Sequence, residues 1–129
     1  MVVYSLPFAI VGPPVAMGRP RFTQTGRVYV PKHTREAVGR IADAAESIIK
    51  EPIEGAISLK VTFVHARPGR LNRKKDPAER MAKTTKPDLD NLIKTVMDGL
   101  TQGNAWHDDN QVCRIYAEDY YAAKGEDPK

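Results

Sequence analysis

Asp88 and Asp90 stand on either side of Leu89, directly after Pro87. Residues two apart in extended chain project from the same face, so both carboxylates can converge just before the helix that we expect to follow. If Asp90 caps that helix, Lys94 lies in its first turn, close enough to reach the same pocket. The spacing therefore predicts two oxygen ligands with an ammonium group beside them.

A second acidic segment, Asp108 and Asp109, follows that helix and leads into the last predicted strand. Our hypothesis is that the chain brings Asp109 back toward Asp88 and Asp90. Three carboxylate ligands without a pair of cysteines or histidines favour Mg²⁺, with Mn²⁺ as a possible substitute, over zinc. Such an ion activates water for attack on phosphorus and stabilises the leaving oxygen, while Lys94 would offset the charge that builds on the phosphate.

Each of these residues also has a purely structural interpretation. Asp88 and Asp90 can interact favourably with the dipole at a helix N-terminus without any metal. Lys94 can be an exposed salt-bridge partner of Asp90 or Asp98, four residues away on either side. The second acidic segment is also a plausible turn. Spacing alone leaves both interpretations open.

The net charge of +4 is moderate, but the charges are unevenly distributed. Residues 1–35 hold five basic side chains and no acidic one, and residues 65–86 hold eight basic against two acidic side chains. From Asp88 onward nine acids face four bases. A polyanion held beside a metal site would need this layout, although solvated surface is the alternative explanation. The residues that we take as candidates for binding the polyanion are Arg19, Arg21, Arg27, Lys32, Arg73, Lys74, Lys75 and Lys86.

The patterns around these segments predict the elements that position them. Segments typical of strands lie at residues 4–11, 21–23, 28–30, 57–63 and 112–122, and the second and third form a hairpin. Helices are predicted over 34–50, capped by Thr34, and over a segment that follows Pro87 and can end at Gly103. Between them, residues 65–86 keep no apolar period and are expected to form a basic loop. This order predicts an α+β domain with two helices packed on a mixed, largely antiparallel sheet.

The size and composition favour one domain. With 129 residues, of which 41% are hydrophobic, the chain can bury one core, and a second domain would leave both undersized. Its single cysteine, Cys113, is expected to be buried and suits a reducing cytoplasm. No stretch approaches the roughly 18 apolar residues of a membrane span, so we expect no membrane partner. An enzyme acting on nucleotides is disfavoured because no GxxxxGK[ST] phosphate loop occurs.

Two motifs together carry a family resemblance. Residues 86–94 have the sequence Lys-Pro-Asp-Leu-Asp-Asn-Leu-Ile-Lys, and residues 108–112 have the sequence Asp-Asp-Asn-Gln-Val. This pair resembles the signature of the RusA family of Holliday junction resolvases, and weaker similarity spans nearly the whole chain. The resemblance implies a homodimeric, Mg²⁺-dependent endonuclease of DNA recombination and repair that binds four-way junctions and cuts two strands symmetrically. Members of this kind are often carried by phages and prophages.

The resemblance also implies roles for individual residues. By motif position, the essential carboxylates correspond to Asp88, Asp90 and Asp109, and the catalytic lysine corresponds to Lys94. A dimer is physically reasonable, because a two-fold substrate that needs two cuts is matched by two equivalent sites. We expect the family to continue into a further strand beyond Lys129, so the single domain of residues 1–129 would lack that strand. The alternative function is a catalytically inactive relative that binds junctions or other DNA.

Overall fold

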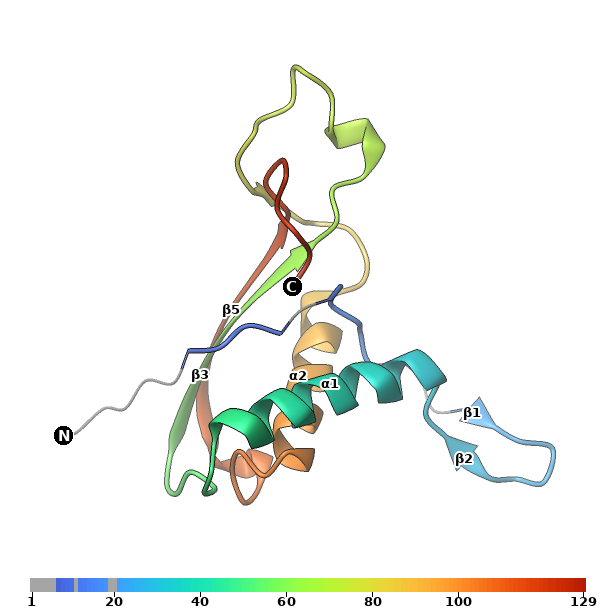
Figure 1. Ribbon diagram of the computed structural model, residues 1–129. Helices are drawn as coiled ribbons and strands as arrows, with labels where there is room; N and C mark the ends of the chain where they lie inside the picture. Colours follow the sequence, from blue (N-terminus) through green and yellow to red (C-terminus); the bar gives the residue numbers. More distant parts are fainter. Residues whose placement is uncertain (1–6, 11, 19–20) are drawn as a thin grey trace.

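The computed structural model describes residues 7–10, 12–18 and 21–129, and of Arg21 and Phe22 it describes the backbone (Figure 1). Its elements, in chain order, are β1 (Arg21–Phe22), β2 (Val28–Tyr29), α1 (Lys32–Ile48), β3 (Ile57–His65), η1 (Gly69–Leu71), β4 (Met81–Ala82), α2 (Leu89–Gln102), η2 (Asp109–Gln111) and β5 (Val112–Tyr121). The predicted α+β class, with two helices and a mixed sheet, is confirmed. Within the described ranges, no helix is long and apolar enough to cross a bilayer.

The larger sheet has β5 between β3 and β4. Strands β3 and β5 run parallel, with Ile57 beside Val112 at one end and His65 beside Tyr121 at the other. Strand β4 pairs antiparallel with only the end of β5. The sheet was predicted to be largely antiparallel, whereas its long pairing is parallel and only the short pairing of β4 is antiparallel. Parallel neighbours cannot be joined by a tight turn, and the connection through α2 supplies the crossover that they need.

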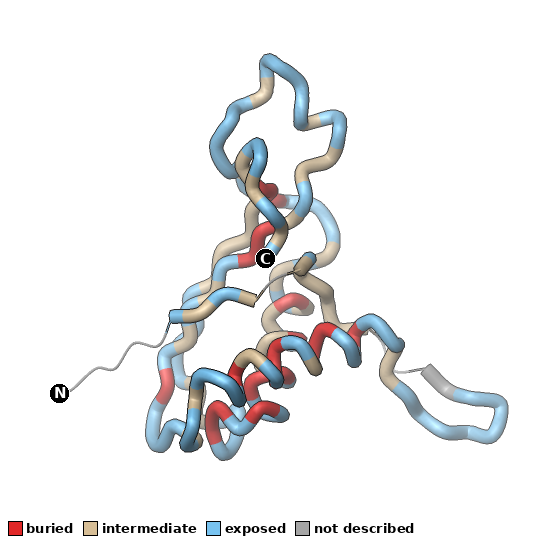
Figure 2. Tube along the Cα trace, viewed as in Figure 1, coloured by how far each residue is buried: buried red, intermediate tan, exposed pale blue. Residues whose placement is uncertain are grey.

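The two helices pack closely because α2 has small residues where it meets α1. A Cβ atom at Gly99 would lie 2.5 Å from Ile41, and one at Gly103 would lie 2.6 Å from the carbonyl oxygen of Ala42. A larger residue at either position would force the helices apart, since protein interiors leave no spare volume. Buried residues gather where the helices meet (Figure 2). The main cluster consists of Ile41, Ala45, Ile57, Leu100, Ala105 and Trp106.

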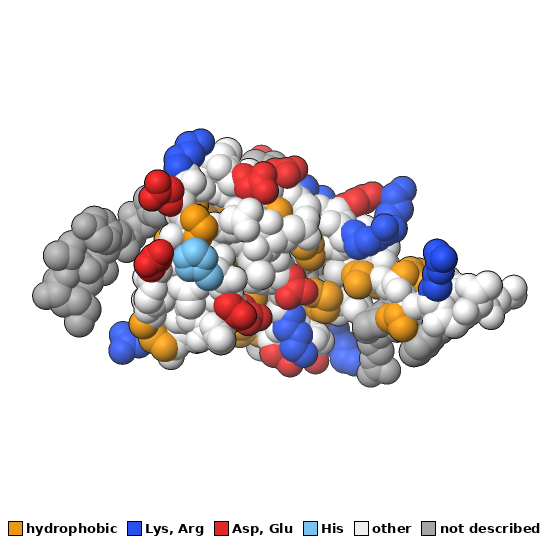
Figure 3. All heavy atoms as spheres, turned by 90° about the horizontal axis from the view of Figure 1, so that it is seen from below, with side chains coloured by type: hydrophobic (Ala, Val, Ile, Leu, Met, Phe, Trp, Pro, Cys, Tyr) orange, Lys and Arg blue, Asp and Glu red, His pale blue; other side chains and the backbone are white. Residues whose placement is uncertain are grey.

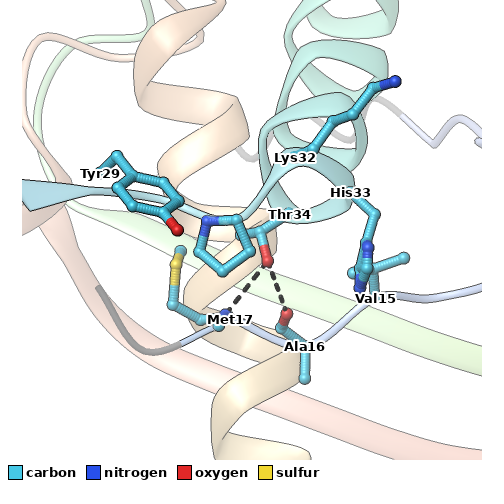
Figure 4. A pocket seen from close by; sticks show the side chains of 9 residues that line it. Val15, Ala16, Met17, Tyr29, Lys32, His33 and Thr34 are labelled. Atoms are coloured by element: carbon cyan, nitrogen blue, oxygen red, sulfur yellow. Dashed lines mark hydrogen bonds between the residues drawn. The ribbon is translucent and has the colours of Figure 1, made fainter. Parts of the chain in front are cut away.

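The N-terminal boundary of α1 differs from the prediction. The helix is capped by Pro31 and begins at Lys32, so Thr34 is not its cap. Thr34 is buried instead, where its Oγ1 accepts a hydrogen bond from the Gly18 amide (3.2 Å) and donates to the carbonyl of Ala16 (3.4 Å) (Figure 4). Tertiary contact with the preceding segment therefore outweighs the capping preference of this threonine.

Three other predictions concern the strands and the residues in them. The predicted strand at 4–11 falls partly outside the described residues, and residues 7–10 form no strand. Cys113 is exposed, contrary to the expectation of burial. The reason is that β4 covers only the far end of β5 and leaves the beginning of that strand without a neighbour on this side. The predicted hairpin is confirmed, with Arg21 opposite Tyr29, and it projects from the body of the protein (Figure 1).

Candidate active site

The first acidic segment forms the beginning of α2. Asp88 is the N-cap residue, and Asp90 is the second residue of the helix, which therefore begins two residues earlier than expected. The predicted pair of carboxylates in extended chain is thus wrong, because only Asp88 is extended. The Asp88 side chain makes no capping hydrogen bond, and both aspartates are exposed. Neither carboxylate therefore caps the helix through a hydrogen bond, and both are free to bind a cation.

Asp90, Lys94 and Asp98 form an exposed stripe along α2. They are four residues apart, which places them on one face of a helix, and all three are exposed. Lys94 lies in the second turn, one turn later than predicted. Among the described residues it takes part in no ion pair, so the salt-bridge interpretation is not what the structure contains. Its ammonium group is available to an anion.

Asp109 lies beyond the other end of α2, as the first residue of η2. A hydrogen bond with Asp108 raises the pKa of Asp109, and partial desolvation and the negative charges of Asp108 and Asp98 act in the same direction. Negative charge is therefore concentrated at this end of the helix. A cation bound here would relieve that repulsion and favour the ionised carboxylate.

Asp108 has a structural role in the same turn. Its Oδ1 accepts a hydrogen bond from the Asn110 amide (3.0 Å), and the Oε1 of Gln111 accepts one from the Asp108 amide (3.0 Å), which completes a capping box. The Nε2 of Gln111 also donates to the carbonyls of Ile53 (2.9 Å) and Gly55 (3.0 Å). The second motif therefore fastens this turn beside β3 and leaves the carboxylate of the following aspartate exposed.

The three predicted metal ligands do not meet within one chain. Eight residues of helix, about 12 Å of rise, separate Asp90 from Asp98, which is the helix residue that influences Asp109. Ligand atoms lie only about 2 Å from a Mg²⁺ ion, so carboxylates at opposite ends of α2 cannot share one. Across the ranges that the structure describes, no three Asp, Glu, His or Cys side chains are grouped around a possible metal position. The expected convergence is wrong for the single chain, and the roles of these aspartates remain predictions.

A cavity of about 280 Å³ opens beside Asp88. Buried charges lie in its wall, where the Lys83 ammonium is 3.5 Å from Asp119 Oδ2, and the other carboxylate oxygen of Asp119 is 2.7 Å from His65 Nε2. These three residues were not among the predicted site residues. The available signal was Asp119 itself, because an acid in a strand that ends in buried residues must find a partner.

A second, larger cavity of about 610 Å³ lies where β2 meets α1 (Figure 4). It is lined by Met17, Tyr29 and Lys32 among others, and by none of the acidic residues described above. Lys32, a predicted DNA-binding residue, also pairs with Glu36 across one helical turn at 3.8 Å. We assign this cavity no chemistry.

The predicted DNA-binding residues of the N-terminal part gather around the hairpin. Arg21 belongs to β1, Arg27 is exposed just before β2, and Lys32 opens α1, whereas Arg19 lies outside the described residues. In the view from below, the charged side chains visible toward the hairpin are basic, while acidic ones spread over the middle of the face (Figure 3). Lys86 is exposed immediately before the acidic segment of α2.

Of residues 65–86, predicted as a basic loop, His65 ends β3, Met81–Ala82 form β4, and residues 66–80 form a projection that contains the short helix η1 (Figure 1). The guanidinium group of Arg67 holds it by donating to four backbone carbonyl groups. The acceptors are Ala122 (3.0 Å), Leu71 (3.2 Å), Glu79 (2.5 Å) and Pro77. The half-buried Arg67 side chain therefore helps to keep the projection folded where regular secondary structure is short.

Ion pairs divide the basic residues of the projection into two groups. Arg73 is paired with Asp76 (3.2 Å), and Arg80 is paired with Glu126 (2.6 Å). Lys74 and Lys75 are exposed and form no ion pair with any described residue. The projection therefore offers these lysines to an anionic partner, with Arg73 already engaged.

Two comparisons relate the chain to known proteins. The family model described as "Endodeoxyribonuclease RusA" matches residues 11–126, which include both acidic segments and the whole projection. The "Uncharacterized protein YqaN" of Bacillus subtilis (strain 168) is 32% identical over an alignment of 128 positions, and this alignment covers 89% of this chain and 87% of that protein. The similarity therefore extends through the fold and is not confined to the motifs.

Proposed function

Because the chain belongs to the RusA family of endodeoxyribonucleases, we propose that it is a Mg²⁺-dependent nuclease that resolves four-way DNA junctions by paired, symmetric cuts in recombination or repair. The observation that carries this proposal is the exposed stripe of Asp90, Lys94 and Asp98. It lies between Asp88 at one end of α2 and Asp109 at the other. We place the activity in the cytoplasm, where a single unpaired cysteine is stable.

The donor set suits a hard divalent cation. Asp88, Asp90 and Asp109 would hold it through carboxylate oxygens, the ligand type that Mg²⁺ prefers. When bound, the ion would supply an activated water and stabilise the leaving 3′ oxygen. Lys94 would bind the phosphate and offset the negative charge that builds on it, because an ammonium group is worth more near a partly desolvated phosphate than in bulk water.

We propose that each complete site is formed by two copies of the chain. If two α2 helices lie antiparallel about a two-fold axis, Asp88 and Asp90 of one copy come beside Asp109 of the partner subunit. The separation of the carboxylates along α2 supports this arrangement, and so do Ile115 and Tyr116, which are 43% and 57% exposed at the uncovered beginning of β5. The same axis generates two equivalent sites, as two symmetric cuts require.

Basic surface flanks the proposed sites and would hold the DNA arms. Arg27 and the hairpin lie on one side, and Lys74 and Lys75 lie on the projection, with Lys86 next to Asp88. Lysine and arginine side chains that neutralise phosphates release counterions, so binding should weaken as salt rises. Such contacts carry no sequence information and suit a protein that selects DNA by its shape.

The test uses a synthetic four-way junction and a linear duplex of the same sequence, each with Mg²⁺ or with EDTA. We expect symmetric nicking of the junction only, and only with Mg²⁺. Asp90→Asn should abolish cutting and preserve or tighten junction binding, because it removes a ligand and a charge that repels DNA. Asp43→Asn, on the exposed face of α1, is the matched control and should cut normally. Junction binding without any cutting by the unaltered protein would favour the inactive DNA-binding alternative.

A further inference from the structure

Lys83 is a buried lysine whose ammonium group binds the chain just before Asp88. Its side chain is 3% exposed. The Nζ atom donates hydrogen bonds to the carbonyl of Thr85 (2.6 Å) and to the carbonyl of Pro87 (3.0 Å). The second carbonyl belongs to the peptide group that joins Pro87 to Asp88. The lysine therefore contacts the backbone that determines where the Asp88 side chain begins.

Strand β5 anchors this lysine from the other side. Asp119, with a side chain only 8% exposed, lies 3.5 Å from Lys83 Nζ, and its backbone carbonyl accepts a hydrogen bond from the Lys83 amide (3.0 Å). The hydroxyl group of Thr85 is also hydrogen bonded to that of Tyr121 in the same strand, at 2.7 Å. The segment from 83 to 87 thus has no regular structure after β4, yet it is fastened to the strand at the centre of the sheet.

We propose that Lys83, held by Asp119, is a positioning residue that sets the Asp88 carboxylate for metal binding; this inference rests on the proposed nuclease function. The side chain of Asp88 makes no capping hydrogen bond, so its place depends on the backbone before it. Lys83 and Asp119 lie behind Asp88 in the wall of the same cavity. A ligand displaced by about 1 Å can cost about 100-fold in rate, so this support belongs to the function as well as to the fold.

A stabilising role alone does not explain a charge at this position. Burying an ammonium–carboxylate pair is costly, and well-packed apolar residues of similar volume often give equal or greater stability. What an apolar side chain cannot do is bind two carbonyl groups and thereby restrain residues 85–87. The charge is therefore best explained by the geometry that it imposes on the start of α2.

The test replaces Lys83 with methionine, which keeps the length of the side chain and removes the donor. Junction affinity in EDTA, the single-turnover cleavage rate and the Mg²⁺ concentration at half-maximal rate are measured for the unaltered protein, Lys83→Met and Asp119→Asn. We expect Lys83→Met to cut about 10- to 100-fold more slowly and to need more Mg²⁺, with junction affinity nearly unchanged. Asp119→Asn should show a smaller effect in the same direction. Lys50→Met is the control, because Lys50 also donates to a backbone carbonyl, that of Ser47, at the far end of α1.

Each outcome decides the inference. An unchanged rate and Mg²⁺ requirement in folded Lys83→Met would overturn it, and so would a parallel loss of affinity, rate and thermal stability, which indicates support of the fold alone. If Lys83→Met does not fold, an unaltered Mg²⁺ requirement in Asp119→Asn would overturn it. If the unaltered protein cuts no junction, the proposed function fails first and the inference falls with it. That result differs from the case in which the unaltered protein cuts the junction and Lys83→Met cuts it equally well, which would overturn the inference alone.

Discussion

His65 Nε2 lies 2.7 Å from Asp119 Oδ1, and this contact joins the last parts of the parallel strands β3 and β5. The two residues are 54 positions apart in the sequence. Burial lowers the pKa of His65 from its usual 6.5; the charge of Asp119 opposes this shift, and the charge of Lys83 adds to it. The folded protein therefore disfavours the protonated form of this histidine relative to the unfolded chain.

This shift predicts a loss of stability in mild acid. Below about pH 6.5 the unfolded chain binds a proton at His65 more readily than the folded chain does, so the free energy of unfolding should fall as the pH decreases. Urea unfolding at pH 7.5 and pH 5.5 measures the change. His65→Gln should lose less stability between these pH values than the unaltered protein, whereas the exposed control His107→Gln should lose as much. Equal losses in all three proteins would contradict the prediction.

Lys94→Ala should slow junction cleavage by about 100-fold with little change in the fold. Removing one preorganised group that stabilises transition-state charge typically costs this much, and Lys94 is exposed without an ion pair to any described residue. Single-turnover cleavage at saturating protein measures the chemical step, and circular dichroism checks the helices. An unaltered rate would make Lys94 an ordinary surface lysine.

Lys74→Gln combined with Lys75→Gln should weaken junction binding and reduce its salt dependence. If each lysine contacts one phosphate, the slope of log affinity against log salt should fall by about 2. Arg73→Gln should change the slope less, because Arg73 is paired with Asp76 at 3.2 Å. Titrations of junction binding between about 50 and 200 mM salt separate these cases. The same slope in all proteins would exclude the projection from phosphate contact.

A mixture of two inactive variants should regain activity if each site is shared between subunits. In a dimer of Asp90→Asn with Asp109→Asn, one site loses both aspartates and the other keeps all of its ligands. We therefore expect single-strand nicks of the junction after the two proteins are mixed and allowed to exchange subunits. Mixing the Asp90→Asn protein with itself is the control. A mixture that stays inactive despite demonstrated exchange would place the whole site within one chain.

The sequence by itself determined the local elements and the kinds of chemistry available. The apolar periods located both helices to within about two residues, alternation located β3, and the last strand was predicted close to the bounds of β5. These signals are local, because side chains on the same face recur every 2 residues in a strand and about every 3.6 residues in a helix. The acidic motif likewise indicated candidate oxygen ligands and a candidate lysine without any knowledge of the fold.

The tertiary structure decided which of these groups meet. The parallel pairing of β3 with β5 placed Asp119 beside His65, and the antiparallel pairing of β4 with β5 brought Lys83 to the same carboxylate. Contacts of this kind join distant residues through packing and register, which leave no periodic trace in the sequence. Spacing along a chain bounds how far apart two residues can lie, but only packing decides whether they come together.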